Sequence, residues 1–138
     1  MKRAADNALK ERLASLTGVP KAWPNIDFDP SKPGNLPYLS CVIVRASTTD
    51  DTLEADDPIL TGRLIASVVA SEGSGEAAAD QIAERVADLF PMGLRITSDD
   101  IIVVITQPPH IRDGIGDGSY WRVPVIIPFQ SSKPTAGE

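Results

Sequence analysis

The chain has 138 residues and a formal net charge of −6 at pH 7, which is enough for one domain with a real core and too short for two ordinary ones. Its single cysteine and single histidine exclude a disulfide framework, a thiolate metal site and three-histidine zinc chemistry. The excess of acids argues against a surface that grips nucleic acid, and no apolar run approaches the length that crosses a bilayer.

Apolar residues at three- and four-residue spacing predict an N-terminal helix with a narrow apolar stripe. Its members are Ala5, Ala8, Leu9, Leu13 and Leu16. Gly18 and Pro20 end the pattern, and we expect the helix to pack on a sheet. Because Lys, Glu and Arg interrupt the apolar residues, the segment is not a signal peptide, and we expect the chain to stay in the cytoplasm.

Three prolines between Pro20 and Pro37 predict an extended, irregular connection, which Trp23, Ile26 and Phe28 would pin to the body. The next run, Tyr38–Ala46, is rich in β-branched residues and apolar on both faces, as an interior strand would be. Cys41 lies within it, and we expect a buried, unreactive thiol.

An acidic segment, residues 47–58, follows this strand. It contains five acids and no base, namely Asp50, Asp51, Glu54, Asp56 and Asp57. Such residues could bind Mg²⁺ or Ca²⁺, but the segment lacks the alternating ligands and the central glycine of an EF-hand. We therefore expect a solvated loop that joins two antiparallel strands.

The stretch from Thr61 to Phe90 is the most strongly patterned part of the chain. Leu64, Ala66, Val68 and Ala70 alternate with polar residues and predict a half-buried strand. Ser74 is a candidate N-cap, and a helix with an apolar face of Ala79, Ile82, Ala83, Val86, Leu89 and Phe90 follows. Pro91 ends the helix and Gly93 turns the chain.

The polar face of this helix carries an acidic stripe, Glu76, Asp80, Glu84 and Asp88. Like charges four residues apart cost about 0.2 to 0.5 kcal/mol for each pair, and only Arg85 offers local relief. The stripe is either an ordinary solvated surface or one that faces a basic partner or a channel.

The C-terminal third predicts a short strand at 94–96, a buried strand at 101–106 and a strand from Trp121 to Phe129. Pro124 and Pro128 place that last strand at a sheet edge or a bulge. We expect the Gly- and Asp-rich residues 110–119 to be irregular, His110 to lie on the surface, and the glycines of 114–118 not to form a phosphate loop, because no Lys-Ser/Thr follows.

The order of elements predicts an α+β fold: one mixed, mainly antiparallel sheet of four to five strands with two helices packed on one face. We expect residues 1–130 to form this domain and residues 131–138 a disordered tail. No catalytic constellation emerges, and we expect no enzymatic activity, cofactor or metal.

The whole chain also resembles a known family through many weak marks. These are Trp23, Asn25, Phe28 and Pro30; the strand starts Pro37-Tyr38-Leu39 and Thr61-Gly62; Gly75 and Ala79 in a helix that ends Phe90-Pro91-x-Gly93; Pro108-Pro109; and the closing run from Tyr120 to Pro128. Over residues 2–130 they resemble the tail terminator, or tail completion, proteins of long-tailed bacteriophages and phage-derived gene transfer agents.

The resemblance implies a structural virion protein, assembled in the bacterial cytoplasm and found at the head-proximal end of the tail. It implies a homo-hexameric ring that caps the tube of major tail protein, stops its polymerisation and offers a surface to the head–tail connector or stopper protein. DNA would pass through the channel without specific binding, and no membrane is involved.

On this interpretation the candidate partner or channel surface is the acidic stripe together with the acids of residues 47–58. The candidate interface anchors are Trp23, Phe28, Tyr38 and Trp121. Two alternatives stay open: a small acidic metal-dependent enzyme, and a monomeric adaptor that binds through the edge of its sheet.

Overall fold

The computed structural model describes residues 2–24, 37–45, 60–71, 76–98, 101–118 and 120–132. Within these ranges, two helices and eight strands follow one another as α1 (Lys2–Ala14), β1 (Lys21–Ala22), β2 (Tyr38–Arg45), β3 (Leu60–Ser71), α2 (Glu76–Leu89), β4 (Arg95–Ser98), β5 (Ile101–Ile105), β6 (His110–Ile111), β7 (Ile115–Asp117) and β8 (Tyr120–Ser132).

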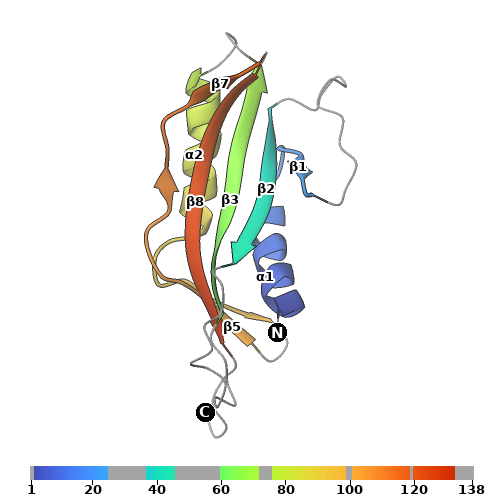
Figure 1. Cartoon of the computed structure of the whole chain (residues 1–138), viewed down its shortest axis with the longest axis vertical. Helices are drawn as coiled ribbons and strands as arrows, with labels where there is room; N and C mark the ends of the chain where they lie inside the picture. The colour runs from blue at the N-terminus through green and yellow to red at the C-terminus, as the bar shows by residue number, and fades with distance from the viewer. Residues whose placement is uncertain are drawn as a thin grey trace, which may run out of the picture.

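All of the strands belong to one sheet, in the order β1-β2-β3-β8-β5-β4, and β6 and β7 also pair with β8. Every pairing is antiparallel except that of β1 with β2. Both helices pack on one face, so that Figure 1 looks onto the other face, with α2 seen behind β8 and β3. The predicted fold class is confirmed, but the sheet is larger than the four to five strands expected.

The predicted apolar faces form one core between the sheet and the helices. Leu9 and Leu13 of α1, Val86 of α2 and Phe90 just beyond it are completely buried, as is Leu64 of β3. Residues on alternate positions of β8, from Val123 to Phe129, complete this layer. Strand alternation and helical periodicity therefore identified the core correctly.

The placement of β8 differs from the prediction. Its prolines suggested a sheet edge or a bulge, yet β8 lies in the middle of the sheet, in unbroken register with β3 along twelve residues from Tyr120 to Ser131. The carbonyls of Pro124 and Pro128 accept hydrogen bonds from the backbone N–H of Arg112 (2.9 Å) and Thr106 (3.2 Å). Since the N and C=O of one residue point to the same side of an antiparallel strand, both missing N–H groups also face away from β3.

On that side the partner of β8 is broken into pieces. β5 pairs with the residues from Phe129 to Ser132, β6 pairs with Ile126 and Val125, and β7 pairs with the residues from Arg122 back to Tyr120. Pro128 and Pro124 fall in the two gaps between these pieces. A central strand therefore tolerates two prolines because the short strands beside it do not pair with a backbone N–H at these two positions.

Two segments expected to be irregular contain short strands. The Gly- and Asp-rich residues 110–119 include β6 and β7, which tertiary pairing with β8 holds in place. In the connection after Pro20, β1 pairs with Leu39 and Ser40 of β2. Ser131 and Ser132, assigned to the tail from the sequence, belong to β8, while residues 133–138 lie outside the described part.

Strand β2 has only one buried face. Leu39 and Cys41 point into the core, whereas Val42 and Val44 are 37% and 38% exposed on the other face. The prediction of an interior strand, covered on both faces, is therefore wrong. Cys41 is buried as expected, and burial raises the pKa of its thiol to about 12, which leaves the group uncharged and unreactive near neutral pH.

The two helices cap each other. Nε of Arg12 on α1 donates to the carbonyl of Leu89, the last residue of α2, at 2.8 Å. In return, Nη2 of Arg85 on α2 donates to the carbonyl of Thr17, just beyond α1, at 3.1 Å. Carbonyls at helix ends lack intrahelical donors, and the guanidinium charges also suit the negative ends of the helix dipoles.

Proline substitutions can test which backbone N–H groups of β8 point toward β3 and which point away from it. We expect Pro124→Ala to lower the free energy of unfolding by about 1 kcal/mol, because replacing proline gives the unfolded chain more conformational freedom. The loss stays small because the new N–H faces a gap and replaces no hydrogen bond. Val125→Pro should cost about 3 kcal/mol or more, because the N–H it removes points toward β3 and leaves a buried carbonyl without its donor. Urea unfolding measures both, with Val125→Ala as the control for lost volume, and equal losses for the two proline changes would contradict the assignment.

The reciprocal capping makes a second prediction. Arg12→Met and Arg85→Met keep most of each side chain and remove the donors, so each should lower the free energy of unfolding by about 0.5 to 1.5 kcal/mol. The neighbouring change Glu11→Gln, at an exposed position of α1, is the control and should have almost no effect. If urea unfolding finds Arg12→Met as stable as the control, the capping bonds contribute nothing.

Candidate assembly surfaces

The acidic stripe lies on the solvent side of α2. Asp80, Glu84 and Asp88 are exposed, while the opposite side of the helix packs on β3 and β8. Glu76 begins the helix, but its side chain lies outside the described part. Three of the four predicted acids therefore form one continuous exposed surface.

Arg112, which the spacing of residues along the helix does not connect with the acidic stripe, lies beside that stripe. Asp80 and Glu84 line a hollow of about 320 Å³ together with residues from the β6–β7 segment, namely Ile111, Arg112, Asp113 and Gly114, and Trp121 of β8. The expected local partner, Arg85, instead donates to the carbonyl of Thr17. The pairing of β6 with β8 carries Arg112 to this place, and helix spacing contains no signal for it.

The described aromatic residues that were expected to anchor an interface are half-buried within the subunit. Trp23 and Trp121 are half-buried and pack against the core. A Cβ atom on Gly114 would stand only 2.4 Å from the Trp121 ring, so this glycine permits the segment to lie flat on the tryptophan. Tyr38 is half-buried in β2, and Phe28 lies outside the described residues.

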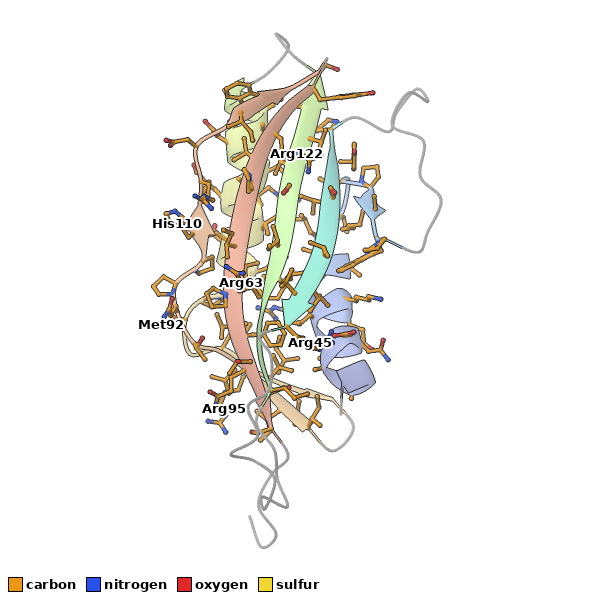
Figure 2. All side chains as sticks on the ribbon, in the orientation of Figure 1. Arg45, Arg63, Met92, Arg95, His110 and Arg122 are labelled. Carbon is orange, nitrogen blue, oxygen red and sulfur yellow. The ribbon has the colours of Figure 1, made fainter. Side chains whose placement is uncertain are left out.

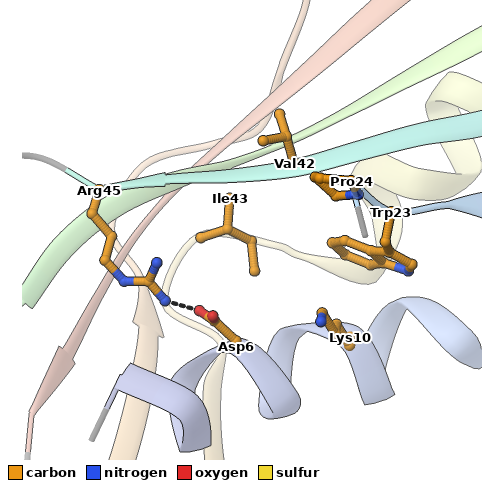
Figure 3. A pocket seen from close by; sticks show the side chains of 7 residues that line it. All are labelled: Asp6, Lys10, Trp23, Pro24, Val42, Ile43 and Arg45. Atoms are coloured by element: carbon orange, nitrogen blue, oxygen red, sulfur yellow. Dashed lines mark hydrogen bonds and ion pairs between the residues drawn. The ribbon is translucent and has the colours of Figure 1, made fainter. Parts of the chain in front are cut away.

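Trp23 also forms one wall of a groove between α1 and the edge of β2 (Figure 3). Lys10 Nζ lies 5.0 Å from the centre of the Trp23 ring, and Arg45 forms an ion pair with Asp6 across the groove. The hollow has a volume of about 200 Å³. Among the described strands, β1 alone flanks this edge of β2, and it pairs only with Leu39 and Ser40.

The largest candidate surface is the sheet face that the helices leave uncovered (Figure 2). Cross-strand register arranges its side chains in rows, such as Val42-Ile65-Ile126 and Val44-Arg63-Pro128. Much of this face is apolar, and Ile115 of β7, at 54% exposure, extends it. Exposed apolar side chains gathered on one face of a subunit indicate an interaction surface.

The charges on this uncovered face are mainly basic. Register places the arginines Arg63, Arg95 and Arg122 there, and the side chain of His110 shares this face. The acidic residue that shares the face by register is Asp117, whose side chain lies outside the described part. Among the described side chains, Asp80, Glu84 and Asp88 lie along α2, and arginines lie on the opposite, uncovered face of the sheet.

The remaining predicted acids, in residues 47–58, lie outside the described residues. Within the described ranges, no group of His, Cys, Asp and Glu is arranged to hold a metal ion. Over the same ranges, no helix is both long and apolar enough to cross a membrane.

The chain is similar to a solved structure and to a known protein family. A solved structure matches 100% of this chain and 99% of its own with a TM-score of 0.78, at 24% sequence identity, and shows the same fold. A search of curated proteins found no match. Residues 4–129 match the model of a family described as phage tail terminator protein. The chain therefore belongs to the phage tail terminator protein family.

Proposed function

We propose that this chain forms a homo-hexameric ring that caps the tail tube at its head-proximal end, ends tube polymerisation and provides the docking surface for the head–tail connector protein. Tail terminators are structural, non-enzymatic components of the virion tail that associate with tail tube proteins. The main support for the proposal is that residues 4–129 match the family model of phage tail terminator proteins. The alternative of a small metal-dependent enzyme is dropped, because the family is not enzymatic.

The uncovered sheet face supports self-assembly. In an isolated subunit the apolar side chains of Val42, Val44 and Ile115 are exposed to water. A neighbouring subunit that covered them would recover the free energy of burying apolar surface. The two edge strands of the sheet, β1 and β4, are short, so that neighbouring subunits can also approach the edges of the sheet. The ring would assemble on the tube in the bacterial cytoplasm.

The charge of the chain suits a conduit for DNA. Six copies would carry about −36, six times the −6 of one chain, and a negative lumen repels phosphates instead of retaining them. Such a ring lets DNA pass without binding a particular sequence.

The α1–β2 groove favours a second candidate function, a monomeric adaptor that binds an extended peptide along β2. The groove joins a strand edge to the half-buried Trp23 ring, and both are features of peptide sites built by strand addition. Native mass spectrometry of the protein bound to tail tubes separates the two, since only the terminator requires six copies.

Removal of the protein tests its role. Particles assembled without it should contain tubes that grow beyond their normal length and do not join heads, because nothing ends polymerisation or presents the connector surface. Electron microscopy measures the tail lengths, and supply of either the wild-type chain or Glu11→Gln should restore joined particles. Tails of normal length attached to heads in the absence of the protein would refute the proposed function.

A further inference from the structure

We propose that the uncovered face of one subunit receives the α2–β4 turn of the next subunit in the ring, with Met92 entering a hollow on that face and Asp88 lying against the arginines around it. The inference rests on the proposed ring and specifies which surfaces join its subunits. The partner is a second copy of this chain.

The receiving site, called here the face hollow, lies over β3 and β8 beside the β6–β7 segment. It has a volume of about 470 Å³ and is lined by Ile65, Ser67, Pro124, Ile126, Ile115, Arg112 and Asp113. Two adjacent rows, Ile65-Ile126 and Ser67-Pro124, form its floor. An apolar floor of this size fits an apolar side chain from outside the subunit.

Arginines surround this floor. Arg63 and Arg122 occupy the rows on either side of it, about 7 Å away along the strands, and Arg112 lies in the wall. Against them the described wall contains a single acid, Asp113. The face hollow is therefore suited to an apolar side chain accompanied by a carboxylate.

The α2–β4 turn offers this combination. Met92 is 61% exposed, the highest value among the exposed large hydrophobic residues described. Asp88 is exposed one helical turn earlier, and Glu84 precedes it by another. An unbranched, polarisable methionine adapts well to an irregular apolar hollow.

The turn is held in one conformation before any partner binds. Gly93 adopts φ +89 and donates its N–H to the carbonyl of Ile105 at 2.7 Å, while the N–H of Leu94 donates to the carbonyl of Pro91 at 3.0 Å. Phe90, immediately before the turn, is completely buried. A rigid projection loses little conformational entropy when it docks.

The two surfaces lie on different parts of the subunit. Figure 2 shows Met92 at the side of the sheet and Arg63 and Arg122 on the strands of the uncovered face. A contact between unlike surfaces is heterologous, and contacts of this kind build a ring when the rotation between neighbouring copies closes. A two-fold dimer, in contrast, would join like surfaces and stop at two copies.

Cysteine cross-linking tests this arrangement on tail tubes. In a Cys41→Ala background, one protein carries Met92→Cys and another carries Ile115→Cys, at the exposed rim of the face hollow. After mild oxidation, mixed rings should contain covalent Met92→Cys–Ile115→Cys dimers, whereas rings of either protein alone should contain none. Glu11→Cys on α1 replaces Met92→Cys as the matched control and should give no mixed dimer.

Charge reversal provides the second measurement. Arg63→Glu and Asp88→Arg should each reduce the occupancy of rings on tubes by about tenfold, and the two changes combined in one chain should restore it to within about threefold of wild type. Arg95→Glu makes the same charge change on the same face but away from the face hollow, and it should assemble like wild type.

The outcomes separate this inference from the proposed function. Wild-type protein that forms no ring on tubes would overturn both. If wild-type protein forms rings but mixed rings of the Met92→Cys and Ile115→Cys proteins give no cross-link, and Arg63→Glu behaves like Arg95→Glu, the subunit contact is overturned and the ring is not. A cross-link from Ile115→Cys to the tube protein instead of a second copy would assign the face hollow to the tube and also overturn the inference.

Discussion

The direction in which Pro124 and Pro128 face organises the sheet. Both lack an N–H, and both turn that side of β8 away from β3, which leaves the β3–β8 ladder complete. The chain after β5 then pairs with β8 in pieces, and the strand pairing is interrupted at each proline, whose carbonyl still accepts a hydrogen bond. This interruption creates the β6–β7 segment, which walls both the hollow beside α2 and the face hollow.

Charge separation is the second constraint, and it follows from the layers of the fold. The acids of α2 project from the helical side, while Arg63 and Arg122 project from the opposite face of the sheet. A subunit with acids along α2 and arginines on the opposite face is suited to head-to-tail association, because one copy can set its acids against the arginines of the next. Its overall negative charge remains compatible with DNA passing through a ring.

The reciprocal arginines explain how two short helices lie firmly on a large sheet. Arg12 and Arg85 each satisfy a carbonyl at the end of the other helix, so that each helix end is completed by its neighbour. The end of α2 is the start of the turn that presents Met92. The packing of α1 against α2 therefore supports the surface proposed to join subunits.

The sequence by itself determined the helices, the long strands, the buried alternate residues and the fold class, because periodicity reports directly which side of an element meets the core. The sequence also predicted the acidic stripe, and its alternation placed Arg63 and Leu64 on opposite faces of β3. Only the tertiary structure decided the central place of β8, the pairing of β6 and β7, and the approach of Arg112 to Asp80. These depend on which distant segment supplies a hydrogen-bonding partner, and local propensity contains no term for that choice.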